Sequence, residues 1–156
     1  MLPKWHILFG ALLSLALYLF FSISLTNSLI FFLASFLIDV DHYLYYVYRK
    51  KDLSLKRAFR WFIALDKKHC SLPRKERNKY DYGVVIFHGI EPVSLIFLLG
   101  LALNLPFMFF IAAGFSFHIL VDVLFTISRK DNPLILVSLA YHVCYSSSRK
   151  NLENSI

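Results

Sequence analysis

The chain has 156 residues, of which 58% are hydrophobic and 17% aromatic, and its formal charge is +7. Soluble proteins average roughly 45–50% apolar residues, and sixteen phenylalanines with nine tyrosines would be hard to bury in so small a soluble core. The composition therefore predicts an all-α membrane protein with one integral domain over residues 1–145, and it argues against a soluble multidomain protein.

Four apolar runs are long enough to cross a bilayer core of roughly 30 Å. They cover about residues 5–25, 29–48, 83–103 and 107–127, and the short connectors TNS (26–28) and NLP (104–106) predict two helical hairpins. The first run is too long for the apolar part of a secretory signal, so we expect a retained helix. A fifth run, 134–145, is too short to cross and predicts an interfacial or re-entrant helix, followed by a flexible tail over 146–156.

A basic loop, residues 49–82, separates the second and third runs. From Arg49 to Tyr82 it holds twelve Lys or Arg and four Asp or Glu, a net charge of +8. The positive-inside rule places this loop and both termini on the cytoplasmic side of the inner membrane. Cys70 and Cys144 then both face a reducing compartment, so no disulfide is predicted.

Part of this loop has the pattern of an amphipathic helix. In residues 53–65 the apolar side chains of Leu55, Phe59, Phe62 and Ile63 recur at helical spacing, with basic residues elsewhere around the helix. Such a helix lies in the headgroup plane. A basic and aromatic segment could also bind nucleic acid, but the flanking spans favour membrane lipids with anionic headgroups. The charges could equally serve topology alone.

Ionisable side chains inside membrane spans are costly and are candidate functional groups. The predicted spans contain seven at matched depth: Asp39, Asp41, His42, His88, Glu91, His118 and Asp122. At a rise of about 1.5 Å per residue, six of them lie roughly 8–13 Å from the cytoplasmic ends of the spans. These six are Asp39, His42, His88, Glu91, His118 and Asp122. His6 is expected to be an interfacial residue, and His142, in the short last segment, is expected to lie outside the site.

Helical spacing puts most of these groups on shared faces. Asp39 and His42, and likewise His88 and Glu91, are three residues apart, while His118 and Asp122 are four apart. Asp41 points elsewhere, which leaves three options: a second-shell group, a ligand to a second ion, or a distorted helix. Pro92 predicts a kink that frees the carbonyl of residue 88.

The charge balance within the spans indicates a cation. The second to fourth spans hold four carboxylates and no Lys or Arg, and unpaired buried carboxylates are too costly to stay ionised. A mixed set of His with Asp or Glu suits Zn²⁺, Mn²⁺ or Fe²⁺. The candidates outnumber the ligands that one ion needs, so a two-metal site is an option. A protonated structural network is the alternative without metal.

Two segments resemble a known family. IDVDH in the second span and HILVD in the fourth are similar to the D-x-D-H and H-x-x-x-D motifs of the membrane-bound metal-dependent hydrolases of bacterial and archaeal inner membranes, which include proteins associated with the LexA regulon. The resemblance covers roughly residues 29–127 and implies metal-site roles for Asp39, Asp41, His42, His118 and Asp122. Between these motifs the family typically has H-R-G-x-T-H-S, whereas this sequence has FHGIEP.

The leading functional hypothesis is a metal-dependent hydrolase acting near the cytoplasmic headgroup level, on a lipid or lipid-phosphate ester. Glu91 and Asp41 are the candidate catalytic carboxylates, with Glu91 as general base unless it is itself a ligand. Two alternatives are a transporter of protons or metal ions and a structural membrane protein in which the metal staples helices together. A staple would have a closed coordination sphere.

Overall fold

The computed structural model describes residues 3–77, 79–81, 86–147 and 150–152. In this part of the chain the fold is helical apart from one pair of two-residue strands. The elements are α1 (Pro3–Phe20), α2 (Leu25–Leu37), α3 (Val40–Lys50), α4 (Leu55–Ser71), α5 (Arg74–Arg77), β1 (Tyr80–Asp81), α6 (Ile90–Ala102), α7 (Phe107–Ser128), α8 (Leu134–Val137), α9 (Leu139–Ser147) and β2 (Lys150–Asn151).

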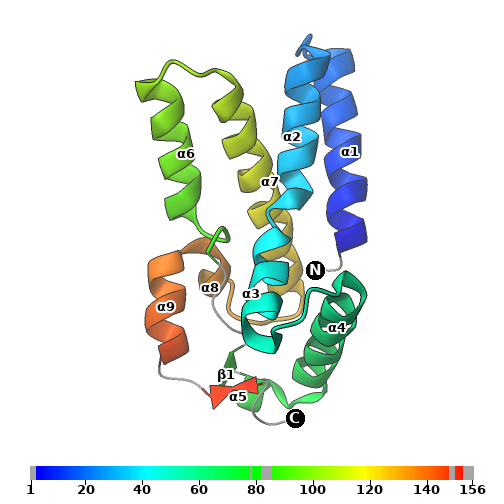
Figure 1. Cartoon of the computed structure of the whole chain (residues 1–156), viewed down its shortest axis with the longest axis vertical. Helices are drawn as coiled ribbons and strands as arrows, with labels where there is room; N and C mark the ends of the chain where they lie inside the picture. Colours follow the sequence, from blue (N-terminus) through cyan, green and yellow to red (C-terminus); the bar gives the residue numbers. More distant parts are fainter. Residues whose placement is uncertain (1–2, 78, 82–85, 148–149, 153–156) are drawn as a thin grey trace.

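The molecule has a bundle at one end and shorter helices at the other. Helices α1, α2, α6 and α7 form the bundle, and α3, α4, α5, α8 and α9 lie below it (Figure 1). Helix α7 and the stretch Leu25–Lys50 are long and apolar enough to cross a membrane, while Lys4–Phe20 and Ile90–Ala102 are shorter apolar helices. The helical fold is thus confirmed, and two of the four predicted spans meet the criteria of length and composition.

The first connection differs in position from the prediction. Helix α1 ends at Phe20 and α2 begins at Leu25, so the TNS segment predicted as a connector belongs to the first turn of α2. Ser24 caps this helix, because its hydroxyl accepts a hydrogen bond from the backbone N–H of Asn27 (3.3 Å). Ser22, with φ of 56°, turns the chain before the cap.

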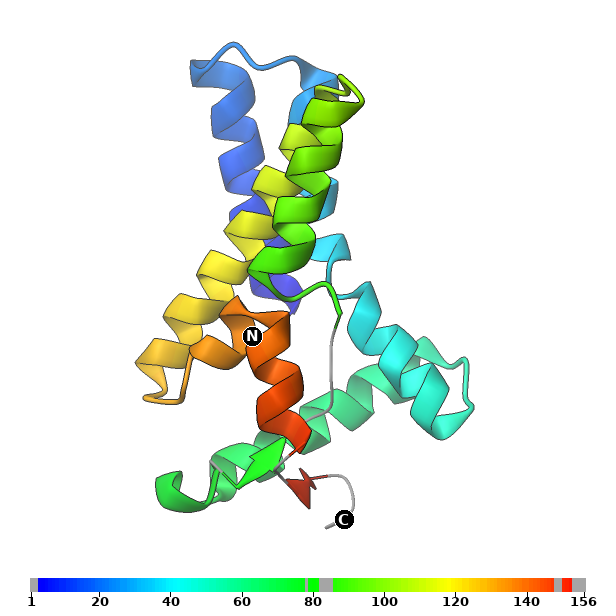
Figure 2. The same cartoon turned by 90° about the vertical axis from the view of Figure 1, so that its left-hand side faces the viewer.

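The second apolar run is broken where its polar residues lie. Helix α2 ends at Leu37 and α3 begins at Val40 in a different direction (Figure 2). Across the break, the backbone N–H groups of Asp39, Asp41 and His42 bond to carbonyls three residues earlier, which is a tighter turn than an α-helix. The distortion considered for this segment is therefore present, and it changes the direction in which Asp41 points.

The third apolar run becomes helical later than predicted. Its first residues, 83–85, lie outside the described part of the chain, residues 86–89 are bends, and α6 begins at Ile90. Pro92 thus falls in the first turn, where no backbone N–H is needed. The predicted kink is wrong for this reason, and His88 precedes the helix.

The amphipathic helix of the basic loop is longer than predicted. Helix α4 runs to Ser71, and the side chains that it buries are Ala58, Leu65 and His69. Leu55 and Phe59 are instead exposed, at 68% and 50%. The helix therefore has a protein-facing side and a separate apolar outer side.

A salt bridge holds the turn that enters α4. The guanidinium of Arg57 donates two hydrogen bonds of 2.6 Å to Asp52, and the Tyr46 hydroxyl donates to the same carboxylate. The Arg57 guanidinium keeps the pKa of Asp52 well below its usual range. These contacts link Tyr46 on α3 and Arg57 on α4 through the carboxylate of the connecting turn.

The C-terminal segment consists of two helices rather than one. Helices α8 and α9 meet at Ser138, whose backbone is extended. Within the tail predicted as flexible, β2 pairs in parallel with β1, and Leu152 is buried. The tail is thus ordered in part because it supplies a strand and an apolar anchor to the basic loop.

Gly114 allows α2 and α7 to approach closely. A Cβ added there would lie 2.7 Å from both the Ala34 Cβ and the Phe31 carbonyl oxygen. We expect Gly114→Leu to destabilise the protein by about 1–3 kcal/mol, as overpacking does, and thermal unfolding measures this. Ala113→Leu, at an exposed position on the same helix, is the matched control. Equal melting temperatures of the two variants would contradict the packing argument.

Candidate metal centre

A cluster of histidines and aspartates lies where the bundle meets the shorter helices. It takes side chains from the start of α1, the α2–α3 break, the segment before α6 and the lower half of α7. The members are His6, Asp39, Asp41, His42, His88, His118 and Asp122. Most are buried, with His6, His88 and His118 no more than 1% exposed. Six of the seven predicted site residues therefore meet in space.

Four ligand atoms in this cluster converge. His88 Nε2 and His118 Nε2 are 3.2 Å apart, and each lies 3.5 Å from Asp39 Oδ1. Asp122 Oδ2 is 3.2 Å from His118 Nε2 and 3.9 Å from His88 Nε2. A tetrahedral zinc ion with ligands at about 2.0–2.2 Å requires ligand–ligand separations of about 3.3–3.6 Å. Four of these five separations are therefore close to those around one divalent ion, and His88 and Asp122 would have to approach each other to complete the set.

Hydrogen bonds at the Nδ1 atoms of His88 and His118 set the tautomers of these two rings. His118 Nδ1 donates to the Ser35 backbone carbonyl at 2.8 Å, and His88 Nδ1 donates to Asp41 Oδ2 at 3.1 Å. In the neutral rings both Nε2 atoms then carry lone pairs and face each other. Metal-binding histidines typically have this arrangement, with the far nitrogen held by a carbonyl or carboxylate.

Asp41 acts behind the ligands. Its Oδ2 accepts from His88 and from the Phe87 backbone N–H (2.9 Å), and its other oxygen is 3.5 Å from His42 Nδ1. Within the described residues, the ion-pair partners of Asp39 and Asp41 are histidines alone. Of the three options considered for Asp41, these contacts match a residue that holds the far nitrogen of His88 and so orients its ring.

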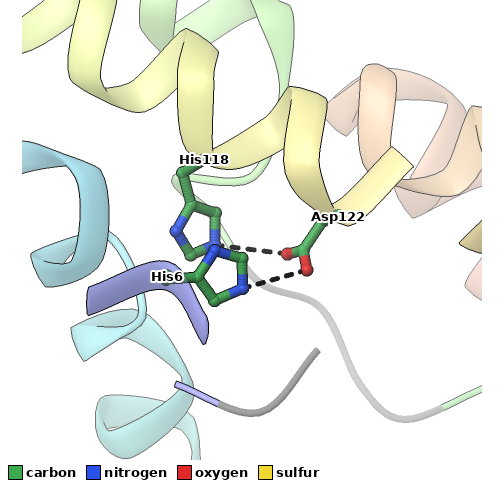
Figure 3. A group of neighbouring side chains, drawn as sticks. All are labelled: His6, His118 and Asp122. Atoms are coloured by element: carbon green, nitrogen blue, oxygen red, sulfur yellow. Dashed lines mark ion pairs between the residues drawn. The ribbon is translucent and has the colours of Figure 1, made fainter. Parts of the chain in front are cut away.

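His6 belongs to the cluster, although the sequence argument placed it at the interface. Its Nε2 lies 3.1 Å from Asp122 Oδ1, and its ring stacks on His118 with centroids 3.8 Å apart (Figure 3). The useful signal was an ionisable side chain near the start of an apolar helix. The depth of His6 relative to the other cluster residues depends on how α1 packs against α7, and the sequence pattern does not predict that packing.

His42 is the accessible member. Its side chain is 37% exposed, and its Nε2 lies 3.7 Å from Asp39 Oδ1. The ring stacks on His88, with centroids 4.7 Å apart and planes at 12°. Since the Asp39 side chain is also 18% exposed, the cluster is accessible on the side of the α2–α3 break.

Ring stacking bears on the number of ions. Two groups of three could each hold an ion: His6, His118 and Asp122, and Asp39, His42 and His88. Each group, however, contains a stacked histidine pair, and the in-plane lone pairs of parallel rings do not converge on one point. The separations therefore favour one central ion, with His6 and His42 outside it.

Glu91 lies apart from the ligand atoms. Its carboxylate accepts hydrogen bonds from the Ser138 hydroxyl (2.6 Å) and the backbone N–H groups of Leu139 (2.8 Å) and Ala140 (3.2 Å). A carboxylate in this position caps the start of α9. Because His88 precedes α6, the predicted helical pairing of His88 with Glu91 does not form.

The remaining candidates have other surroundings. His69 and His142 are both buried, on α4 and α9, and neither belongs to a three-residue ligand group in the described part of the chain. Burial lowers the pKa of His69. Neither Cys70 nor Cys144 forms a disulfide within the described part of the chain, which agrees with the prediction.

No protein-family model, curated protein or solved structure matches this chain. The functional conclusion therefore depends on the geometry and chemistry of the cluster itself.

Proposed function

We propose that this protein is a membrane-embedded metal-dependent hydrolase that acts on a lipid or lipid-phosphate ester near the cytoplasmic headgroup level. The observation that carries the proposal is the convergence of Asp39, His88, His118 and Asp122 at separations suited to one divalent ion. The D-x-D-H and H-x-x-x-D motifs, which resemble those of the membrane-bound metal-dependent hydrolases, contribute three of these four ligands.

Apolar exposure supports the membrane location. Large hydrophobic side chains on the bundle helices remain solvent-accessible, among them Leu15 on α1, Leu29 on α2, Leu95 on α6 and Leu120 on α7. An apolar surface of this kind needs a lipid environment or a partner. In the proposed arrangement the four spans are α1, the stretch Leu25–Lys50, the apolar run that contains α6, and α7; both termini are cytoplasmic, and the +8 loop lies at the inner leaflet.

The helix breaks fit this location. Irregular backbone at membrane depth is tolerated where it is buried in protein or lines a cavity. Before α6, the Phe87 N–H donates a hydrogen bond to Asp41, and near the end of α2 the Ser35 carbonyl accepts one from His118. The side chains of the cluster therefore supply hydrogen-bond partners to backbone groups at the two breaks. The breaks and the cluster therefore stabilise each other.

The accessible side of the cluster suits hydrolysis. A bound divalent ion supplies a water of lowered pKa and polarises the bond under attack. Asp39 is the most exposed of the four residues that would hold the ion, so we propose that a substrate would approach from its side. His42, beside it, accepts the proton of the attacking water. Asp41 and the Ser35 carbonyl hold the two central rings in place.

A metal staple is the second candidate. The observation in its favour is that four protein atoms already surround the central position, as in closed structural zinc sites. Ion transport, the remaining alternative, stays an untested prediction.

Metal analysis and lipid turnover test the proposal together. We expect protein purified in detergent to hold about one zinc, manganese or iron ion per chain. It should hydrolyse a lipid in a radiolabelled membrane extract, lose that activity with a chelator and regain it with the metal. Metal without turnover, together with a lower melting temperature after chelation, would identify a staple. Protein without stoichiometric metal would overturn both candidates.

A further inference from the structure

The outer side of α4 carries an apolar row of side chains and, next to it, a basic row. The apolar row consists of Leu55, Phe59 and Ile63, and the basic row consists of Lys56, Arg60 and Lys67. Residues four or seven positions apart lie above one another on a helix, so each row is continuous. Ile63 is half-buried and the other five side chains are exposed. Apolar and basic rows side by side are typical of a helix that lies in the headgroup plane of a membrane.

The start of α4 is tied to the end of a candidate membrane span. Four residues separate Lys50, the last residue of the apolar stretch Leu25–Lys50, from Leu55. A connection of this length reaches no more than about 18 Å even when fully extended. The Tyr43 hydroxyl holds it against α3 by donating to the Leu53 carbonyl at 2.7 Å.

The direction of α4 differs from that of the bundle. Helix α4 runs across the lower end of the molecule, rather than along the direction of the bundle helices (Figure 2). Because it begins beside the end of the stretch Leu25–Lys50 and runs across the bundle, α4 lies along the cytoplasmic membrane face in the proposed arrangement.

The inner side of the same helix borders the accessible side of the metal centre. The Phe62 ring lies against the His42 ring, with centroids 5.3 Å apart and planes at 34°. His42 is the most exposed residue of the cluster, at 37%, and its ring stacks on His88. Phe62 lies between Phe59 and Ile63 in the sequence. The outward rows and the ring that touches His42 therefore belong to the same two turns of α4.

We propose that α4 docks on the anionic lipid surface of the inner leaflet, with its apolar row among the acyl chains and its basic row at the headgroup phosphates. Charge complementarity supports this partner, because the loop from Arg49 to Tyr82 has a net charge of +8. Each basic side chain near an anionic surface strengthens such binding about fivefold. The inference rests on the membrane location in the proposed function. It adds a lipid contact that gathers anionic lipid on the helix beside His42.

Fluorescence quenching by brominated lipid tests the docking without requiring turnover. The chain has two tryptophans, and Trp5→Phe with Trp61→Phe removes both. In that background, Phe59→Trp introduces a probe into the apolar row and Ala64→Trp is the matched control. Position 64 is also exposed but lies about 140° around the helix from position 59. In nanodiscs of phosphatidylglycerol with brominated acyl chains, the Phe59→Trp probe should lose most of its fluorescence and the Ala64→Trp probe should lose little.

A second arm tests the charges. Lys56→Gln and Arg60→Gln should each lower the ratio of docked to undocked helix about fivefold, measured from the quenching of the Phe59→Trp probe. Brominated phosphatidylcholine should quench this probe less than brominated phosphatidylglycerol does. Equal quenching in the two lipids, with no effect of either charge variant, would overturn the assignment of an anionic partner.

Three other results would overturn the docking itself. These are equal quenching of the two probes, no quenching of the Phe59→Trp probe, and protection of that probe from both brominated lipid and aqueous iodide. The last result would show that a protein partner or a second copy of the chain covers this face. Protein that does not enter nanodiscs would refute the membrane location, whereas protein that enters them and holds its metal without quenching at position 59 would refute this inference alone.

Discussion

His118→Ala should reduce bound metal from about one ion per chain to background. His118 Nε2 is within 3.5 Å of three other ligand atoms, those of Asp39, His88 and Asp122, so it is central to the set. Its removal leaves three of the four ligands, and His88 Nε2 is then the one nitrogen among them, 3.5 Å from Asp39 Oδ1 and 3.9 Å from Asp122 Oδ2. Elemental analysis of purified protein measures the stoichiometry, and competition with a chromogenic chelator measures the affinity.

Two further variants make this result specific. Asp122→Asn keeps the side-chain volume while removing the charge, and it should also lose the ion even if His118→Ala folds poorly. Ser116→Ala is the control on the same helix, because the Ser116 hydroxyl donates to the Ala112 carbonyl and has no contact with the cluster in the described structure. Asp41→Asn, behind His88, should weaken binding by about 10–100-fold. Wild-type affinity in both His118→Ala and Asp122→Asn would refute the metal centre.

Residue type and depth within the predicted spans were sufficient to predict most members of the cluster. Asp39, His42, His88, His118 and Asp122 were grouped because ionisable residues inside apolar runs are costly and because they lie at one level. The predicted helical faces are less accurate, because they require unbroken helices. Asp39 lies in a tight turn and His88 precedes α6, so the local backbone, and not a helical period, sets the directions of these two side chains.

His6 and Glu91 show where the sequence pattern was insufficient. His6 lies near the end of its helix, and only the packing of α1 places it against Asp122. Glu91 has the depth of a ligand, but the Ser138 hydroxyl and the α9 backbone compete for its carboxylate. In both cases the outcome depends on contacts between residues far apart in the sequence, which spacing along one helix does not contain.

His42→Gln should lower kcat for lipid hydrolysis by about 10²–10⁴-fold while leaving bound metal near one ion per chain. The reason is that His42 is the accessible polar side chain beside Asp39, on the open side of the cluster, and lies outside the four converging ligand atoms. A glutamine retains hydrogen-bonding capacity at this place but cannot accept the proton of an attacking water.

The matched control for this variant is Tyr43→Phe. The Tyr43 hydroxyl donates to the Leu53 carbonyl at 2.7 Å, so its loss perturbs the adjacent residue of α3 and leaves the cluster intact. Steady-state kinetics on the lipid identified in the extract assay, with metal analysis of each preparation, measure both effects. If His42→Gln turned over normally, Asp39 or a metal-bound water would have to act without it. If it lost the ion instead, His42 would be a ligand, and the two groups of three would describe two metal sites.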